Sequence, residues 1–548
     1  MNKRFRVCDL DQPYLLPPSL QDWLPENHLA RFIAEVTDEL DLAVIYAKYE
    51  RKDARGLSAY HPLLVTRLLL YGYCTGITSS RRIEKASHDD VAFRYLAANQ
   101  HPDHDTIANF RREHLDALAG LFVQALRLCQ KAGLVKLGNV AIDGTKMMAN
   151  ASTRRSVPYK KLSEREQYWK ETVDRLLAQA QRTDEQEDQQ WGKGQPDDLP
   201  PELAHAKDRL ERLREAKAEL EREAQQQLEA ARKVYTPGKH GGRRKGTLPQ
   251  QPADRQERQR ARVQLRRARE NAAHPHRQYN FVDPDSRVMM DTARKSFTQA
   301  YNAQIAVDSQ AQVIVAAELT QQTSDRRQLL PMVEAVRKAM SSAPETITAD
   351  AGYWDTLSLR DVSLQGIQML VSPDSKPQLP DAELAPSSPH NQEARAMREL
   401  LSSAAGKALY AMRKAIVEPV FGQIKEARGI RRFRLRGLKL VTGEWKLICA
   451  THNLLKLFRH RHPMRPEPSV AIRLTARSNP LVNSVLVKRK IPTNQTSRLP
   501  ATKKVFSPTG SLAVHFETSQ IPNIPPARSP CSVEPSGQIG RASCRERV

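Results

Sequence analysis

Apolar residues recur every three or four positions between residues 15 and 135, the spacing that gathers them on one face of an α-helix. The pattern is clearest in LARFIAEVTDELDLAVIY, PLLVTRLLLYGYCTG and ALAGLFVQALRLCQKAG. Ser79 and Ser80 precede one helical segment, and Asp105 and Thr106 precede another, and such side chains can cap helix N-termini. Residues 1–135 are therefore predicted to form an all-helical domain.

The pattern changes to that of a β-strand at GNVAIDGTKMMANAS, and strand-like segments return at AYNAQIAVDS, AQVIVAAELT, ETITADAGYW and GIQMLVSP. Helical patterns separate the later strands, and Ser324 and Asp325 are placed to cap the first of these helices. This order predicts an α/β domain, a mixed sheet flanked by helices, formed by residues 136–157 and 278–462.

A long charged segment, residues 158–277, separates the two parts of the predicted sheet domain and is rich in Gln, Glu, Arg, Lys and Ala. Its leucines show the heptad spacing of a coiled coil, which predicts a helical arm that favours self-association. The heptad positions are Leu203, Leu210, Leu213 and Leu220. Residues 463–548 are rich in proline and basic, so we expect a disordered tail, with an end that resembles translated flanking sequence.

The chain is strongly basic, with 86 Lys and Arg against 62 Asp and Glu and a net charge of +24. Such a balance favours a polyanionic partner, and double-stranded DNA is the partner we expect. Arg81, Arg82, Arg111 and Arg112 could form one phosphate-binding face of the helical domain, or simply a solvated basic face. No apolar run is long enough for a membrane span, and no signal peptide is evident, so a cytoplasmic, nucleoid-associated protein is expected.

Three carboxylates are candidates for chemistry on phosphate. Asp143 and Asp350 each follow an apolar strand, although an Asp in this setting is often only part of a turn. Glu418 precedes Pro419, which suits the first position of a helix, where an acid is also favourable without any metal. Brought together, three carboxylates repel one another, and Mg²⁺ or Mn²⁺, with two ions expected, would relieve that repulsion and catalyse phosphodiester chemistry.

The segments AIDGTK and TADAGYW, together with a Y-x2-R-x4-E-x6-K pattern, resemble the three catalytic blocks of RNase H-fold DDE transposases from bacterial insertion sequences. The last block resembles that family's YREK signature and is formed here by Tyr410, Arg413, Glu418 and Lys425. The helical segments YHPLLVTRLLLYGYCTGITSSRRIE and PDHDTIANFRREH also resemble that family. The likeness covers roughly residues 10–458, outside the arm.

This resemblance implies an RNase H-like sheet, an N-terminal DNA-binding domain, and a homodimer that joins two element ends. It implies binding to terminal inverted repeats, followed by metal-dependent cleavage and strand transfer. Asp143, Asp350 and Glu418 would be the catalytic metal ligands. Tyr410, Arg413 and Lys425 would contact DNA near the cleaved phosphate.

Two of these positions can be tested against helix geometry. Lys425 follows Glu418 by seven residues, two turns of a continuous helix, so both would project from one face. Arg413 precedes Glu418 by five residues, which is not one face, so it needs a break at Pro419 or serves in a structural ion pair.

The segment RGIRRFRLRGLK alternates arginine with apolar residues, as an extended segment with one face on DNA and the other on the core would. The alternative is a solvated charged surface. The arginines predicted to bind DNA are Arg428, Arg431, Arg432, Arg434 and Arg436. Further along, Trp445, His452 and Asn453 are expected in the core.

Two other functions stay open at the level of sequence. A catalytically inactive relic would keep the basic surface and bind DNA without cutting it. A plain RNase H-like nuclease would share the three acids but would not select element ends.

Overall fold

The computed structural model describes residues 19–50, 59–191, 201–235, 255–291, 295–359, 364–373 and 389–463. The tail predicted from residue 463 onward lies outside these ranges, apart from its first residue. No helix within the described ranges is long and apolar enough to cross a membrane.

The N-terminal part is helical, as its apolar spacing predicts. Its helices are α1 (Leu29–Glu39), α2 (Ala43–Glu50), α3 (Pro62–Thr75), α4 (Ser80–Asp89), α5 (Val91–Leu96), α6 (His104–Glu113) and α7 (Leu115–Lys131). Ser79 is the residue before α4, as predicted, but it makes no side-chain cap bond. The cap of α6 is Asp103, whose carboxylate accepts a hydrogen bond from Thr106 N, so the prediction of Asp105 was two residues late.

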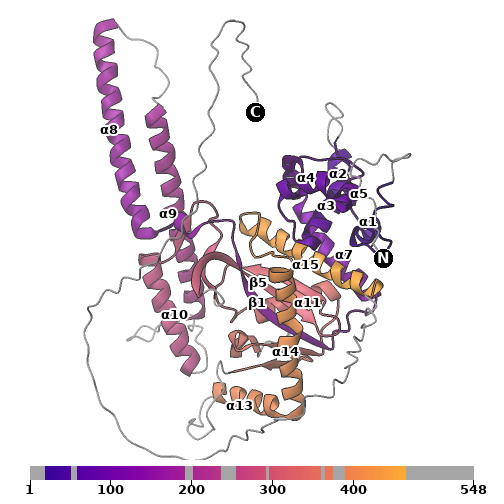
Figure 1. Cartoon of the computed structure of the whole chain (residues 1–548). Helices are drawn as coiled ribbons and strands as arrows, with labels where there is room; N and C mark the ends of the chain where they lie inside the picture. Colours follow the sequence, from indigo (N-terminus) through magenta and orange to yellow (C-terminus); the bar gives the residue numbers. More distant parts are fainter. Residues whose placement is uncertain are drawn as a thin grey trace, which may run out of the picture. The chain divides into compact units, whose positions relative to one another are not determined.

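A mixed sheet forms the centre of the second region, and strands β1 and β5 are labelled in Figure 1. The strands are β1 (Asn139–Met148), β4 (Arg287–Asp291), β5 (Ser296–Asp308), β6 (Ile314–Thr320), β7 (Thr346–Ala349) and β8 (Gln368–Val371). Strand β5 pairs antiparallel with β1, β4 and β6, whereas β7 pairs parallel with β1 and β8. The order is consistent with the RNase H-like fold expected, and β4 is a strand that the sequence pattern did not indicate.

Helices cover this sheet. They are α11 (Leu329–Met340), α12 (Thr356–Leu359), α13 (Pro389–Ser402), α14 (Ala404–Gly422) and α15 (Leu438–Arg461), with a π-helical turn at Gln423–Ala427. Helix α14 packs on β1, β5 and β7, and α15 packs on β6 and on α3 and α7. The Tyr73 hydroxyl donates a 3.0 Å hydrogen bond to Glu444 of α15, so one continuous core joins the helical region to the sheet.

The C-terminal helix α15 is buried along most of its length, which explains its mixed composition. Trp445, His452 and Asn453 are all buried, as predicted. Their polar atoms have partners: Trp445 Nε1 donates to Gln304 O at 3.2 Å, and Asn453 Nδ2 donates to Ile314 O at 2.8 Å. Burial lowers the pKa of His452 to about 3, so this imidazole is neutral inside the core.

The charged insertion forms the predicted arm. It consists of β2 (Ser156–Pro158), α8 (Tyr159–Trp191), α9 (Pro201–Val234), α10 (Arg255–Ala273) and β3 (Gln278–Asn280). The α9 leucines Leu203 and Leu220 are buried against Val173 and Leu162 of α8 in the same chain. These leucines thus pack within the chain, and self-association of the arm stays a prediction.

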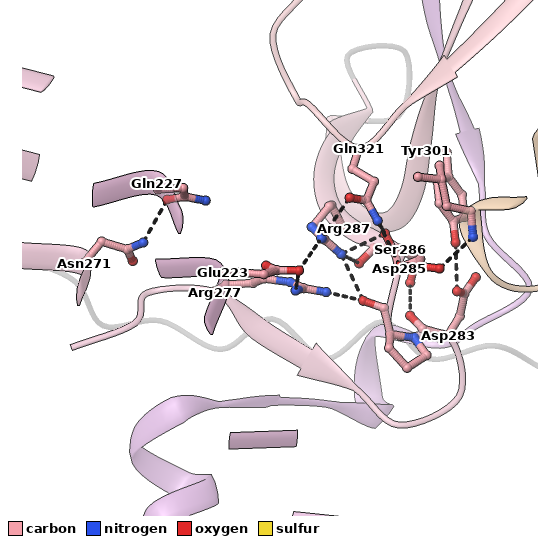
Figure 2. Close-up of polar contacts among 12 residues, drawn as sticks. Glu223, Gln227, Asn271, Arg277, Asp283, Asp285, Ser286, Arg287, Tyr301 and Gln321 are labelled. Carbon is pink, nitrogen blue, oxygen red and sulfur yellow. Dashed lines mark hydrogen bonds and ion pairs between the residues drawn. The ribbon is translucent and has the colours of Figure 1, made fainter. Parts of the chain in front are cut away.

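A polar network fixes the base of the arm to the sheet, as Figure 2 shows. Arg287 donates to Glu223 of α9 and to Gln321, each at 3.1 Å. Asp283 accepts a 2.8 Å hydrogen bond from the Tyr301 hydroxyl, and Asp285 accepts one of 2.7 Å from the first amide of α15, Leu438 N. The loop between β3 and β4 is thus held by α9, β5, β6 and α15 together.

Candidate active site

Two of the three predicted acids lie side by side where the pairing between β1 and β7 ends. Asp350 directly follows β7, as predicted, whereas Asp143 lies inside β1, which continues to Met148 because its second half pairs with β5. Strands β1 and β7 are parallel neighbours, and their last register pair is Ile142 with Ala349. The next residues along the two strands are Asp143 and Asp350. Because parallel neighbours carry the same positions to the same edge of the sheet, the register places these two carboxylates side by side.

The electrostatics of the pair confirm this proximity. The pKa of Asp143 is raised to about 6, first by burial and second by the negative charge of Asp350. Two groups oppose the rise: Gly144 N donates to Asp143 Oδ1 at 2.8 Å, and the Arg413 guanidinium lies 3.8 Å from Oδ2. Burial also raises the pKa of Tyr353 well above its usual value, helped by the nearby aspartates.

A further acid at this site, Asp325, was missed as a functional residue in the sequence. Its Oδ1 accepts hydrogen bonds from Asn302 Nδ2 at 2.6 Å and Gln304 Nε2 at 2.7 Å, and it lies 3.6 Å from Lys146 Nζ. Its charge is close enough to help raise the pKa of Asp143. The sequence signal for Asp325 is its position just after the third predicted strand of the domain. The helical pattern that follows favours its interpretation as a helix cap instead.

The predicted cap for α11 was therefore wrong. Helix α11 begins at Leu329, and Gln328 precedes it without a side-chain cap bond. Asp325 turns instead toward the two amides of β5 and the ammonium of Lys146. Burial lowers the pKa of Lys146, while the negative charge of Asp325 acts in the opposite direction.

Gly144 follows Asp143 in β1 and lies close to the side chains of two residues from other elements. A Cβ on Gly144 would lie 2.7 Å from Asp325 Oδ1 and closer still to the Gln304 amide. A side chain here would therefore displace the Asp325–Gln304 hydrogen bond, which passes close to this residue.

Helix α14 carries the remaining family-type residues, but it differs from the predicted local structure. Glu418 and Pro419 lie inside α14, near its end, and not at a helix start. The missing amide of Pro419 leaves Ala415 O without its helical donor, and Gln312 Nε2 donates to this carbonyl at 2.9 Å. The helix therefore continues through Pro419 without the break that we expected for Arg413.

Arg413 points from α14 to the aspartates, and its guanidinium also lies over the Tyr410 ring at 5.7 Å from the centroid. Lys425 lies in the π-helical turn, so the seven residues that separate it from Glu418 are not two regular turns. Its ammonium donates to Thr145 Oγ1 at 2.5 Å and to Lys146 O at 2.9 Å, next to Asp143 along β1.

Glu418 is exposed on α14. Over the part of the chain that the structure describes, no three His, Cys, Asp or Glu side chains are grouped closely enough to hold one metal ion. The structure thus brings Asp143 and Asp350 together and places Arg413 beside Asp143. It holds Lys425 against Thr145 and Lys146 of β1, and it does not gather Glu418 with the aspartates.

The basic segment after α14 divides into two parts. Arg428 is buried at 8% exposure, and its guanidinium donates to Thr451 Oγ1 at 2.9 Å and more weakly to Tyr73 O and Ile448 O. Arg428 is therefore a structural residue of the core and not part of the DNA-binding surface that the sequence predicts. Arg111, proposed for a basic face of the helical domain, is likewise buried, where it donates to Thr78 O at 2.8 Å.

The later arginines are exposed, namely Arg431, Arg432, Arg434 and Arg436. The intervening Ile430 and Phe433 are buried, so the predicted alternation is correct at these two positions. The segment is not a regular strand, since its only ladder contact within the described residues is the bridge between Arg432 and Met148 of β1. Arg436 Nε and Asn150 O form a further 3.1 Å hydrogen bond.

A family model described as a transposase domain (DUF772) matches residues 18–113, and one described as a transposase DDE domain matches residues 381–458. These two matches support a DDE transposase of an insertion element. No curated protein and no solved structure matches the chain.

The two matched segments correspond to different parts of the fold. The first spans α1 to α6, and the second spans α13, α14 and most of α15, including Glu418 and Lys425. Transposases act on DNA, and DDE transposases generally use divalent metal ions.

Proposed function

We propose that this transposase binds the terminal inverted repeats of its element, cleaves the DNA there and transfers the cut strand to a target. The observation that carries the proposal is the pairing of Asp143 and Asp350 on parallel strands, with the raised pKa of Asp143. A half-buried carboxylate pair of this kind is costly unless positive charge balances it.

The donor chemistry of this pair fits a divalent cation. Both residues offer only carboxylate oxygens, which favours Mg²⁺ or Mn²⁺ over softer metals. We propose Asp143 and Asp350 as ligands, with Glu418 as the third, and two ions as in other two-metal sites. When bound, the cation supplies Lewis-acid catalysis of phosphodiester cleavage.

The protein's own cations have separate roles in this proposal. Arg413 neutralises part of the charge of Asp143 from the α14 side, and Lys146 does so from β1 through Asp325. Lys425, held between Thr145 and the Lys146 carbonyl, places an ammonium next to the aspartates, where it pairs with a DNA phosphate. Tyr410 supports the Arg413 guanidinium through its ring.

The third acid needs movement or local rearrangement to join the pair, because Glu418 is exposed on the opposite flank of α14 from the buried Val417 and Val420. We propose that this occurs when DNA and metal are bound. We also propose a homodimer on paired DNA ends, with contacts other than the heptad face of α9, which α8 covers.

The test is cleavage of labelled duplex that carries the element's terminal repeat, with Mg²⁺ or Mn²⁺ and the full chain. Asp143→Ala, Asp350→Ala and Glu418→Ala should each reduce cleavage by at least about a hundredfold while leaving duplex binding largely intact. Glu334→Gln, an exposed acid on α11, is the matched control and should cleave normally.

Other outcomes distinguish the alternative functions. Binding without cleavage under either metal would leave an inactive relic. Equal cleavage of unrelated duplex would indicate a plain nuclease. Normal cleavage by Glu418→Ala alone would remove this residue from the active site and leave the aspartate pair.

A further inference from the structure

Two basic cavities adjoin one another beside the end of β1 and the start of the arm. One, of about 410 Å³, is lined by Arg154, Arg155, Lys161 and Arg165, among others. The second, of about 500 Å³, is lined by Arg155, Arg432 and Arg436 among others. The two cavities share Arg155, and the described residues that line them include no Asp or Glu.

Each cavity also contains an exposed phenylalanine. Phe281 lines the first and is 39% exposed, and Phe297 lines the second and is 66% exposed. Phe297 lies on β5 opposite Met290 of β4, which is itself 49% exposed. A large aromatic side chain left in water beside several arginines is typical of a surface that stacks on nucleic-acid bases.

The cavity walls are held in place by hydrogen bonds. Gln299 accepts from Ala149 N at 2.9 Å and from Ser156 Oγ at 3.2 Å, and its amide donates to Ser286 Oγ at 2.8 Å. The loop after Phe281 is fixed by the bond between Asp283 and Tyr301, shown in Figure 2. These walls are therefore formed before any ligand binds.

The cations at the cavities are free to bind an anion. Among the described residues, none forms an ion pair with the guanidinium of Arg155 or Arg432, and both side chains are exposed. Three like charges around one cavity repel one another, and a phosphate would relieve this repulsion.

The position of the cavities relates them to the aspartate pair. Met148, which lines the second cavity, follows Asp143 by five residues along β1. At about 3.4 Å per residue this corresponds to roughly 17 Å, a few nucleotides of an extended strand. A DNA strand cut at the aspartates can reach the cavities without leaving the surface of β1.

We propose that the two cavities bind successive unpaired nucleotides of a DNA strand. Phosphates lie at Arg155 and its neighbouring cations, and bases stack on Phe281 and Phe297. A single strand is favoured over a duplex because paired bases are stacked on each other and do not expose their faces to a side chain. This inference rests on the proposed function for its choice of DNA as the polymer.

The test measures binding of fluorescein-labelled oligothymidine of eight nucleotides to the full chain by anisotropy, in EDTA so that no cleavage occurs. Phe297→Ala should weaken binding by about fivefold to a hundredfold, and Phe281→Ala should act in the same direction. Phe297→Trp should restore binding. Val44→Ala, an equally exposed apolar residue on α2, is the control and should have no effect.

Duplex of the same length provides the second arm, and its affinity should be unchanged by Phe297→Ala. Equal losses for duplex and single strand, or no loss for the single strand, would overturn the inference. The circular dichroism spectrum and melting temperature of each variant show whether it is folded. Because this assay involves no cleavage, its failure leaves the cleavage test of the proposed function untouched, and the reverse also holds.

Discussion

The acidic site and the basic surface lie along the same strand, β1, yet the protein treats their charges in opposite ways. Asp143 is largely enclosed, hydrogen-bonded to Gly144 N and paired with Arg413, and its pKa is raised to about 6. Arg432, which bridges to the end of the same strand, is exposed. The environment of Asp143 raises the pKa of its carboxyl, whereas the exposure of Arg432 leaves its guanidinium accessible to a partner.

This difference explains why the aspartate pair has many contacts within the protein, whereas the exposed arginines have few. Burial and the nearby negative charge of Asp350 both disfavour the ionised form of Asp143, and a bound cation would relieve this unfavourable interaction. A phosphate contact needs only an accessible guanidinium. Residues of the same type can therefore have different roles, as the arginines after α14 demonstrate.

The largest expected effect concerns the buried member of that basic segment. Arg428→Ala should lower the free energy of unfolding by about 2–4 kcal/mol, because it leaves a cavity and removes the donor to Thr451 Oγ1 and the nearby carbonyls. Arg432→Ala, on the exposed part, should change it by no more than about 0.5 kcal/mol. Urea denaturation at neutral pH measures both, and equal effects would contradict the division between the two arginines.

A smaller effect should follow from the raised pKa of Asp143. The folded chain keeps a proton on this carboxyl up to about pH 6, whereas the unfolded chain loses it near 3.8, so stability falls as pH rises between these two values and stays lowered above them. Asp143→Asn should therefore stabilise the protein at pH 7–8 in EDTA by up to about 3 kcal/mol, and have little effect at pH 4.

The measurement is the midpoint of chemical denaturation of both proteins across pH 4–8. The stability gained by the substitution should increase as pH rises from about 4 to 6 and then level off. A gain that is constant with pH would mean that neither burial nor the charge of Asp350 raises the pKa of Asp143.

The fold was largely predictable from sequence, because periodicity reports which residues are buried. This periodicity predicted the helical N-terminal region, the mixed sheet and the helical arm. The details that it missed depend on contacts distant in sequence. Gln312 compensates for Pro419 from more than a hundred residues away, and Arg428 turns into the core while its neighbours do not.

The candidate site shows the same division. Asp143 and Asp350 were identifiable because each follows an apolar run, although β1 continues past Asp143 to Met148 through its pairing with β5. Asp325 was not, since its interaction with Gln304 and Lys146 depends on how the loop after β6 turns back over β1. No local pattern encodes that path.

The smallest effect expected here is on the salt dependence of DNA binding. Each phosphate contact contributes about 0.9 to the slope of log affinity against log salt concentration, so Arg432→Ala combined with Arg436→Ala should lower the slope by up to about 1.8. Lys338→Ala, an exposed cation on α11, is the control and should leave the slope unchanged. Duplex with the terminal repeat is titrated between low and moderate salt in EDTA. An unchanged slope in the double variant would mean that DNA does not follow β1 toward these arginines, and the acidic and basic parts of the strand would then serve different ligands.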